Sequence, residues 1–507
     1  MFLKRLFKIS LLLFILIGLG MCAYPVLHND LGYNTDIARD FLILQDAVTT
    51  HKLPLIGPRT GGIDGLFHGP LWTWINLPVF IFSHGNPVAT GWFWIFLIIC
   101  LLLIVFYVST KVFNKYVGLL SALVLSFALV GNSSSFLNPF GAVLISPLFL
   151  YFFYKYINSL KIIYLLLTFL AIGLMIQFEV AFGGPMLVLT IVYLLFFLFK
   201  TKKMSHFLSI FILLIPLSTY ILFDLRHNFL QLKSILGHIG SPTGNGRETF
   251  IEILQNRKDG ILHTIMSIPY APLLICLLVI AFFIYIALKS YKNKNLKYRQ
   301  FYLLFTYFYF GYWPLSFYLN GDVQSYHVQP FLPMAIIVLC SSYLVVRREI
   351  FAVIFLIILY FNFTYDSAIL SGFASFSSNS PGSWLFNYHL AQRVFSLAPK
   401  EFGYYVFTAD ELGYGPKYAI TYVNRQNPNK IVYPYIKKHI TFIVLAPVNG
   451  GDNNNRTWWV KNKVKINKEP ITAIDYPNGY RIEEYSLTDD EVKVPSDPNL
   501  MSGLFYR

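Results

Sequence analysis

Long apolar runs, separated by short polar segments, occupy residues 1–366 of this chain. An α-helix needs ~20 apolar residues to cross the hydrocarbon core of a bilayer, and about eleven runs come near this length. They predict membrane-spanning helices at 9–27, 88–108, 117–136, 139–157, 162–179, 183–199, 206–223, 264–288, 300–319, 328–346 and 350–366. A shorter apolar run at 69–83 contains Pro70 and Pro78 and is expected to lie in the membrane interface.

From residue 367 the pattern changes to polar sequence with many Gly, Asn and Asp residues. Alternation and β-branched or aromatic content predict strands at 403–408, 419–423, 431–435 and 440–446. Residues 387–398 have a helical pattern. The predicted fold class is therefore a polytopic α-helical membrane protein (1–366) with a small α/β C-terminal domain (367–507).

The composition agrees with a membrane protein. Of the 507 residues, 56% are hydrophobic and 13% are charged, whereas soluble domains carry about 25% charged residues; the mean hydropathy is +0.55. A net charge of +15 would favour nucleic-acid binding in a soluble protein. Here the basic residues lie mostly in short loops between the predicted spans, so no nucleic-acid partner is expected. The cysteines lie in or beside apolar runs without metal-ligand spacing and are expected to be packing residues.

Lysine and arginine fall in alternate loops of the predicted bundle. The positive-inside rule places these loops and the N-terminus in the cytoplasm, with the first run as an uncleaved anchor in the plasma membrane. An odd number of spans leaves the C-terminal domain outside the cell. Before residue 367, only Glu349 among the acids is then predicted on the cytoplasmic side. This asymmetry indicates a polar site on the outer face.

The first outer loop, 28–87, contains Asp36, Arg39 and Asp40. Helix positions four apart share a face, so both carboxylates can point the same way with the arginine beside them. A carboxylate at the membrane surface can serve as general base toward a hydroxyl acceptor. The simpler interpretation is a solvated helix face that carries an Asp–Arg pair.

Further polar residues lie at the predicted outer ends of spans, where their burial would be costly. They occur in the segments FHGPLW (67–72), QFE (177–179), LFDLRHNF (222–229) and YHVQPFLP (326–333). With the preceding Asp-x-x-Arg-Asp motif, their order resembles that of the GT-C superfamily of membrane glycosyltransferases. The resemblance is greatest to the bacterial branch related to protein O-mannosyltransferases and lipid A aminoarabinose transferase, and it extends over most of the membrane part.

This resemblance implies a transferase that uses a sugar linked to polyprenyl phosphate. In that family the first-loop aspartate is the catalytic base, which corresponds to Asp36 here. Asn34 and Thr35 precede it where the mannosyltransferase branch has an Asp-Glu pair, so Asp40 stays an alternative. A single displacement by an acceptor hydroxyl would invert the anomeric configuration.

The chemistry of such a transfer suggests roles for other side chains. A leaving phosphate needs cations or hydrogen-bond donors, and the candidates are Arg39, Arg59, Arg226, His227 and His327. The candidates for binding the sugar or the acceptor are Gln177, Glu179, His68 and Tyr326. For Arg226 the simpler interpretation is an interfacial snorkelling residue, and for Glu179 it is a plain loop residue.

No cofactor is required by this interpretation. Asp36, Asp40, Glu179 and His327 would be the ligands of a divalent cation if the fold gathered them, because hard cations prefer oxygen ligands. Their spacing does not demand a metal ion. The long outer loop 224–263 has several glycines and could act as a lid. No nucleotide-phosphate motif occurs in it, which fits a lipid-linked donor.

Together these observations favour a hexosyl- or pentosyltransferase of the cell envelope. Its partners would be membrane lipids, a polyprenyl-phosphate sugar and an acceptor glycan, lipid or protein. The alternative is a membrane transporter or lipid flippase. Transporters place functional polar residues in broken helices near the bilayer midplane, whereas the charges here gather at the outer boundary. A non-catalytic scaffold is a third interpretation, and it predicts no penalty for losing Asp36.

Overall fold

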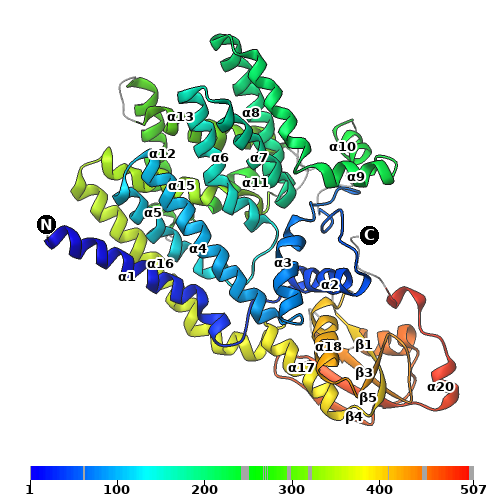
Figure 1. Ribbon diagram of the computed structural model, residues 1–507. Helices are drawn as coiled ribbons and strands as arrows, with labels where there is room; N and C mark the ends of the chain where they lie inside the picture. Colours follow the sequence, from blue (N-terminus) through cyan, green and yellow to red (C-terminus); the bar gives the residue numbers. More distant parts are fainter. Residues whose placement is uncertain are drawn as a thin grey trace.

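The computed structural model describes residues 2–60, 63–240, 250–266, 268, 270, 272–293, 298–317, 323–408, 410, 412–447 and 454–501. Within them the chain is mostly helical, with one five-stranded sheet near the C-terminus. Figure 1 shows a large bundle of helices with the sheet domain at one end, and with α2 (Thr35–Thr50) and α3 (Leu71–Phe82) between the two. This is the predicted fold class, an α-helical membrane protein with a small C-terminal α/β domain.

The other helical segments of the bundle follow one another along the chain. They are α1 (Phe2–Leu27), α4 (Pro87–Val112), α5 (Lys115–Ala128), η1 (Val130–Asn132), α6 (Pro139–Ser159), α7 (Ile162–Phe178), α8 (Val180–Thr201), η2 (Met204–Leu214), α9 (Ser218–Arg226), α10 (Leu230–Gly240), α11 (Phe250–Met266), α12 (Leu273–Lys292), α13 (Arg299–Ser316), α14 (Ser325–Val328), α15 (Phe331–Ser341), η3 (Ser342–Leu344) and α16 (Arg348–Asn379). Each predicted span overlaps one to three of these segments. Residues 267, 269, 271, 318 and 319, where a predicted span includes them, lie outside the described residues. In the predicted outer loop 224–263, residues 241–249 lie outside the described residues.

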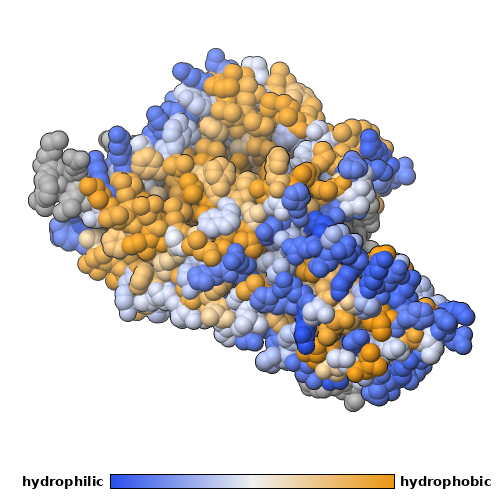
Figure 2. Space-filling view, turned by 60° about the horizontal axis from the view of Figure 1, so that its bottom comes forward, coloured by the Kyte–Doolittle hydropathy of each residue, from blue (hydrophilic) through white to orange (hydrophobic). Residues whose placement is uncertain are grey.

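Among the described helices, five are long and apolar enough to cross a membrane: α1, α4, α6, α8 and α16. Shorter apolar helices accompany them, so the number of spans stays a prediction. Apolar side chains also cover the outside of the bundle: Figure 2 shows apolar surface over the helices and mostly polar surface over the sheet domain. In α4, for example, Trp94 and Ile98 are buried, whereas Phe96 and Leu103 are exposed. Such a surface fits lipid rather than water, and the chain is a multi-pass membrane protein.

The predicted span at 206–223 is not one straight helix. Its first part, η2, has 3-10 geometry and meets α9 at an angle of 61°. Pro216 lies at this break, where a continuous helix would need the backbone N–H that proline lacks. The break lets α9 approach the first outer loop, and the rings of Phe223 and Phe67 lie 5.8 Å apart between their centroids.

The last helix of the bundle, α16, continues to Asn379, so the predicted domain boundary at residue 366 falls inside a helix. The predicted boundary follows the change to polar sequence from residue 367. The segment 367–379 stays helical because it packs along α1, where the rings of Phe373 and Tyr24 lie 5.4 Å apart in an edge-to-face arrangement. The first helix after this segment is α17 (Trp384–Leu397).

The C-terminal sheet has the order β2-β1-β3-β5-β4. Its strands are β1 (Glu401–Phe407), β2 (Ile431–Pro434), β3 (Ile440–Leu445), β4 (Thr472–Asp475) and β5 (Arg481–Ser486). Strand β1 pairs parallel to β2 and β3, and β5 pairs antiparallel to β3 and β4. The other segments are α18 (Tyr414–Gln426), α19 (Asn454–Trp459), η4 (Val460–Val464), α20 (Asp489–Lys493) and η5 (Pro498–Met501).

The predicted strand at 419–423 is wrong, because this segment belongs to helix α18. Its β-branched and aromatic residues look strand-like locally. However, Pro416, Ile420 and Val423 are buried at the i, i+4, i+7 spacing of a helix face, and α18 packs on α2 and α17. The predicted strands at 403–408, 431–435 and 440–446 correspond to β1, β2 and β3. Strands β4 and β5 were not predicted.

Helix α18 joins the sheet domain to the first outer loop. The hydroxyl of Tyr418 donates a 2.6 Å hydrogen bond to the backbone carbonyl of Gly85. The Tyr418 ring also packs on Phe41 of α2, with 5.2 Å between the ring centroids. Nearby, the hydroxyl of Thr35 donates to Asp410 Oδ2 at 2.9 Å. The C-terminal domain therefore supports the helix that carries Asp36 and Asp40.

Candidate functional site

Helix α2 begins at Thr35, directly after Asn34. The side chain of Asn34 accepts a 2.9 Å hydrogen bond from the backbone N–H of Ile37, which is the usual cap of an exposed helix start. Ile37, Phe41 and Leu44 are buried and anchor one face of the helix in the core. Asp36 and Asp40, which are one turn apart, lie on the neighbouring side of the helix together with the contact to Arg39.

Asp36, Arg39 and Asp40 form one ion-paired cluster. Arg39 Nη1 lies 2.6 Å from Asp36 Oδ1, and Nη2 lies 3.0 Å from Asp40 Oδ1. The two carboxylates differ in access: the Asp36 side chain is 52% exposed, whereas that of Asp40 is 15% exposed. The Asp36 carboxylate is thus accessible to an incoming molecule, whereas the less exposed Asp40 carboxylate holds the guanidinium of Arg39.

The environment of Asp40 favours its neutral form. Burial raises the pKa of Asp40 to about 6, and the neighbouring Arg39 charge opposes this effect without cancelling it. Asp40 Oδ2 is buried and has no hydrogen-bond partner among the described residues. A carboxyl group that titrates near neutral pH and keeps one oxygen unoccupied is typical of a functional site.

Two histidines lie close to this cluster. His68 comes from the first outer loop and His327 from α14, and His68 is within electrostatic range of both Arg39 and His327. Burial lowers the pKa of His68 to about 3 and that of His327 to about 4, and nearby cations add to both shifts. Both rings are therefore neutral at pH 7, and a contact from either to phosphate would be a neutral hydrogen bond.

Tyr326 connects the cluster to Glu179. Its hydroxyl is within electrostatic range of Glu179, Asp36 and Arg39, and its ring lies edge-on to His327. Glu179 is 1% exposed, and burial raises its pKa to about 8, so it is protonated at neutral pH. Its Oε1 accepts from the backbone of Ala181 at 3.1 Å, whereas Oε2 has no partner in the described part of the chain.

Gln177 connects three segments of the chain through hydrogen bonds. Its Nε2 donates to the carbonyl of Pro216 and, at 2.9 Å, to Thr219 Oγ1, which holds the break between η2 and α9. Its backbone carbonyl accepts from Gly69 at 2.9 Å. Gln177 thus fixes the loop that carries His68, and its buried Oε1 has no partner among the described residues.

Arg257 on α11 is a cation near this site that the sequence did not reveal. It is 2% exposed, and its Nη2 donates to the backbone carbonyl of Ser316 at 2.7 Å. It lies within electrostatic range of His327. The sequence places Arg257 in the long predicted loop 224–263, where an arginine is expected to be exposed. Its burial becomes visible only in the folded structure.

Arg59 and His227 line a second cavity, which has a volume of about 590 Å³ and a mainly apolar lining. Its wall includes Ile43 and Ala47 of α2, which continue the face of Asp36 and Asp40 along the helix. Arg59 pairs with Asp64 at 2.7 Å. The His227 ring stacks on Phe223, with 4.0 Å between centroids.

Lys52 also lines this second cavity and was not predicted. Arg226 is exposed and does not line it. The predicted candidates are therefore divided into three groups. Asp36, Arg39, Asp40, His68, Glu179, Tyr326 and His327 lie around one site, and Gln177 borders it through its contact with Gly69. Arg59 and His227 lie at the apolar cavity, and Arg226 lies apart from both.

No group of three or more His, Cys, Asp or Glu among the described residues could hold a metal ion. The acids of the site are separated by their own partners, since Asp36 and Asp40 both pair with Arg39. Glu179 is held by the N-terminus of α8. The predicted metal independence itself stays a prediction.

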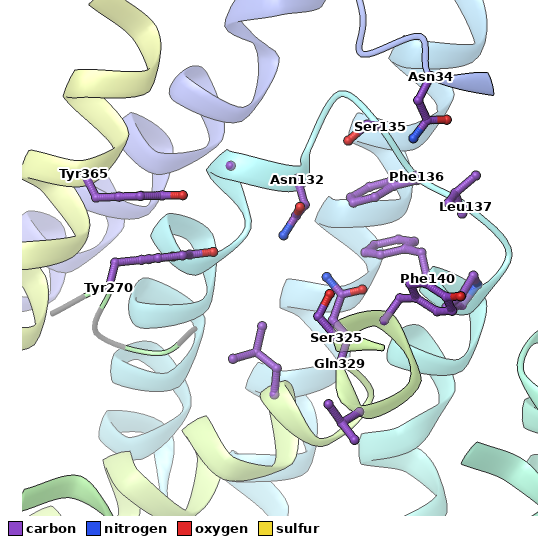
Figure 3. Close-up of a pocket in the computed structure, with 15 residues that line it drawn as sticks. Asn34, Asn132, Ser135, Phe136, Leu137, Phe140, Tyr270, Ser325, Gln329 and Tyr365 are labelled. Atoms are coloured by element: carbon purple, nitrogen blue, oxygen red, sulfur yellow. The ribbon is translucent and has the colours of Figure 1, made fainter. Parts of the chain in front are cut away.

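A third feature is a cavity of about 350 Å³ beside the start of α2, shown in Figure 3. Asn34, which caps α2, lies at its edge, and Tyr326 also belongs to its lining. Asn132 and Gln329 extend toward its centre from opposite walls. This cavity therefore adjoins the site through the helix cap and through α14.

Comparisons with known proteins place the fold. No protein-family model matches the sequence, and no curated protein sequence matches it. The structure resembles that of ArnT, a lipid A aminoarabinose transferase, from Cupriavidus metallidurans bound to undecaprenyl phosphate, with a TM-score of 0.60 and 11% identity over 96% of this chain and 99% of that one.

The apo form of the same protein matches with a TM-score of 0.59 and 9% identity, over 93% of this chain and 97% of that one. An oligosaccharyltransferase from Archaeoglobus fulgidus matches with a TM-score of 0.49 and 12% identity, over 81% of this chain and 64% of that one, a likeness too weak for further argument. At these identities the likeness concerns the fold alone, and the chain shares the overall fold of ArnT.

Proposed function

We propose that this protein is a membrane glycosyltransferase that moves a sugar from a polyprenyl-phosphate carrier to an acceptor hydroxyl at the outer face of the membrane. The observation that carries the proposal is the Asp36–Arg39–Asp40 cluster, in which an accessible carboxylate is held by a buried ion pair. Its place in a fold shared with ArnT, whose structure contains undecaprenyl phosphate, supports a lipid-phosphate donor.

In this proposal Asp36 is the general base. It accepts the proton of the acceptor hydroxyl while that oxygen attacks the anomeric carbon of the donor. The bond between the anomeric carbon and the phosphate oxygen breaks, and its electron pair leaves on the polyprenyl phosphate. One displacement inverts the anomeric configuration. The exposure of Asp36 supports this role, because a base must contact the acceptor.

Asp40 is the alternative base, since its pKa of about 6 suits proton transfer near neutral pH. Its geometry favours a positioning role instead. It is largely buried, and the guanidinium of Arg39 lies against its Oδ1 through both Nε, at 3.2 Å, and Nη2. Asp40 would therefore hold Arg39 in the orientation in which it meets Asp36 and the leaving phosphate.

The lipid-phosphate donor would use both groups of cations. Arg39, assisted by neutral His68 and His327 as hydrogen-bond donors and by the field of buried Arg257, would stabilise the leaving phosphate. The apolar cavity lies along the same face of α2 and would take the first isoprene units, with Lys52, Arg59 and His227 at its polar edge. Glu179, Tyr326 and Gln177 would contact or orient the sugar or the acceptor.

The proposal includes the predicted orientation, with the N-terminus in the cytoplasm and the C-terminal domain outside. The distribution of lysine and arginine between alternate loops supports it. In this orientation the α2–α18 contact lies at the outer surface, and the C-terminal domain would cover the acceptor side of the site. A hexosyl or pentosyl group would be transferred to a glycan, lipid or protein.

One observation favours the alternative of a transporter or flippase. Asp366, within the apolar helix α16, is fully buried, and both its carboxylate oxygens have no hydrogen-bond partner among the described residues. A buried acid within an apolar helix is a functional candidate by default. A flippase would need Asp366 and would tolerate loss of Asp36, whereas the transferase needs Asp36.

The decisive experiment uses purified protein in lipid with a panel of polyprenyl-phosphate sugars, and it follows release of free polyprenyl phosphate. Asp36→Asn and Asp40→Asn are compared with Asp490→Asn, a matched control whose side chain is 96% exposed on α20. Release that is lost in Asp36→Asn and kept in the control supports the proposal. Full release by Asp36→Asn on a working donor would overturn the mechanism.

A further inference from the structure

The cavity of about 350 Å³ beside α2 has an unusual lining for a membrane protein site. Among its described lining residues none carries a charge at neutral pH. Its polar groups are amides and hydroxyls, contributed by Asn34, Asn132, Ser135, Ser325 and Gln329, together with tyrosines. Amides and hydroxyls are uncharged and can both donate and accept hydrogen bonds, so they match a ligand that itself presents hydroxyl groups.

These polar side chains are not consumed by the fold. In the described part of the chain, no hydrogen bond is made by the side chain of Asn132, Ser135 or Gln329. Figure 3 shows Asn132 and Gln329 extending into the cavity from different elements, η1 and the turn after α14. Each primary amide offers two N–H donors and one carbonyl acceptor. They are therefore available to pair with a ligand between them.

Rigid aromatic pairs form two sides of the same cavity. Phe136 and Phe140 stack with 3.6 Å between centroids, and Tyr270 and Tyr365 stack with 4.1 Å and an interplanar angle of 5°. Stacked rings cannot rotate freely, so the walls are preorganised before a ligand enters. Apolar and aromatic walls with a few convergent polar groups are the usual lining of a small-molecule pocket.

The cavity adjoins Asp36 through two residues. Asn34 lies in its lining and caps the helix turn that carries Asp36. Tyr326 also lines it and lies within electrostatic range of Asp36, Arg39 and Glu179. A ring held in the cavity would therefore have one edge at the entrance to the catalytic cluster.

We propose that this cavity binds an uncharged, hydroxyl-rich sugar ring next to Asp36. This inference rests on the proposed transferase function and specifies its substrate class. A sugar with an ammonium or carboxylate group would lose its hydration without meeting a counter-charge in the described lining. The ring belongs either to the donor or to the acceptor glycan, because both present the same hydroxyl chemistry.

Asp366 is the acid that would answer a cationic sugar instead. It follows Tyr365 in α16 and lies within electrostatic range of Tyr270, another lining residue. Its carboxylate is fully buried and is not part of the cavity lining. The amide pair therefore defines the binding chemistry of the cavity, and Asp366→Asn provides a separate test for a charged sugar.

The test compares Asn132→Ala and Gln329→Ala with Asn158→Ala, an exposed amide at the opposite end of α6 from the cavity. Donors are undecaprenyl phosphate linked to glucose, mannose, arabinose, 4-amino-4-deoxyarabinose or glucuronic acid. We expect a neutral sugar to be used, and each cavity variant to weaken the step that binds it by about tenfold, the effect of one or two lost hydrogen bonds. The control should match wild type.

The two sources of the sugar give different results. If the donor sugar occupies the cavity, the variants raise KM for the neutral donor and leave the affinity for sugar-free undecaprenyl phosphate unchanged. If the acceptor glycan occupies it, donor binding is unchanged and KM for the glycan rises. Either pattern supports the proposal. Selective use of the amino or acidic sugar, or unchanged kinetics in both cavity variants, would overturn it.

A binding measurement separates this inference from the proposed function. Saturation-transfer NMR with free glucose, mannose and arabinose reports binding without any transfer. Neutral-sugar binding that is lost in Asn132→Ala, with no donor turnover by wild type, would leave the cavity assignment standing and remove the transferase. Donor turnover by wild type, with no neutral-sugar signal and no effect of either cavity variant, would support the transferase and overturn the cavity assignment.

Discussion

Asp30, just after the first apolar helix, accepts a hydrogen bond at Oδ2 from the hydroxyl of Ser383 at 2.8 Å, although the two residues are 353 positions apart in the chain. The same carboxylate accepts from the backbone N–H groups of Leu31 and Leu385 at Oδ1. Asp30 is fully buried. The C-terminal domain is thus attached to the first outer loop through a satisfied buried acid.

Replacing Asp30 should therefore loosen the whole site. Asp30→Ala leaves the backbone N–H groups of Leu31 and Leu385 without their carboxylate acceptor, which costs about 2–4 kcal/mol, while the Ser383 hydroxyl keeps the carbonyl of Ser377 at 3.0 Å. Asp30→Asn keeps one acceptor oxygen and should lose less. Thermal unfolding in detergent is the measurement, with Asp490→Ala as the exposed control. An unchanged unfolding midpoint for Asp30→Ala would show that the two parts do not depend on this contact.

The second prediction concerns the base. Asp36→Asn keeps the shape of the side chain and removes the proton acceptor, so kcat should fall by about 10²–10⁴. The affinity for polyprenyl phosphate should change little, because Arg39 keeps its contact with Asp40. Rates of donor consumption and equilibrium binding of the lipid check the two parts. Loss of lipid binding equal to the loss of rate would instead indicate a role in binding.

The sequence predicted this cluster because its geometry is local. Asp36, Arg39 and Asp40 lie within one helical turn, and Asn34 is a good helix cap. The proximity of His327 to His68 and Arg257 depends on the packing of a loop, α14 and α11, and no pattern along the chain encodes it. Sequence patterns alone cannot reveal such contacts between distant segments.

The same distinction explains the errors in the fold. Pro216 marks a break by its own chemistry, but the 61° angle depends on the packing of η2 against α7. In α18 the strand-like residues Tyr418, Ile420 and Val423 form a helix because its buried face meets α2 and α17. Tertiary packing outweighed local propensity there, and it did so where the two domains meet.

The third prediction is a pH dependence that belongs to Asp40. Its pKa is raised from 3.8 to about 6, so an unfolded chain loses this proton before the folded one does. The stability that neutral Asp40 contributes is therefore complete below about pH 4 and is lost as the pH rises through 6. Ionised Asp40 holds Arg39 more strongly, so activity should rise over the same interval.

Asp40→Asn should remove both effects. The pH profile of its kcat/KM should show no inflection near pH 6. The unfolding midpoint of wild type should fall between pH 4.5 and pH 8 by more than that of Asp40→Asn. Asp36→Asn serves as the comparison for stability, since its carboxylate is half exposed. An inflection near pH 6 that persists in Asp40→Asn would assign this titration to another group.

The fourth prediction uses the buried acid Glu179. Burial raises its pKa from 4.5 to about 8, so it is protonated in the folded protein at neutral pH. Glu179→Gln imitates that neutral form and should keep the activity at pH 7. Because the wild type loses stability as the pH rises from about 4.5 through 8, the variant should unfold at a higher temperature than wild type at pH 8. Unfolding midpoints of wild type and Glu179→Gln at pH 5 and pH 8 give the comparison. A variant that unfolds at a lower temperature than wild type at pH 8 would mean that the carboxylate is ionised and paired.

The fifth prediction concerns the loop that carries His68. A Cβ added at Gly69 would lie 1.8 Å from Gln177 Oε1. Gly69→Ala therefore forces the Gln177 side chain to move, which breaks its hydrogen bonds to Pro216 and Thr219. We expect a loss of about 2–4 kcal/mol in stability and a lower rate, because His68 moves relative to Arg39. Gly184→Ala is the matched control, since a Cβ there meets nothing within 4 Å. Equal midpoints and rates for both variants would show that Gln177 does not position this loop.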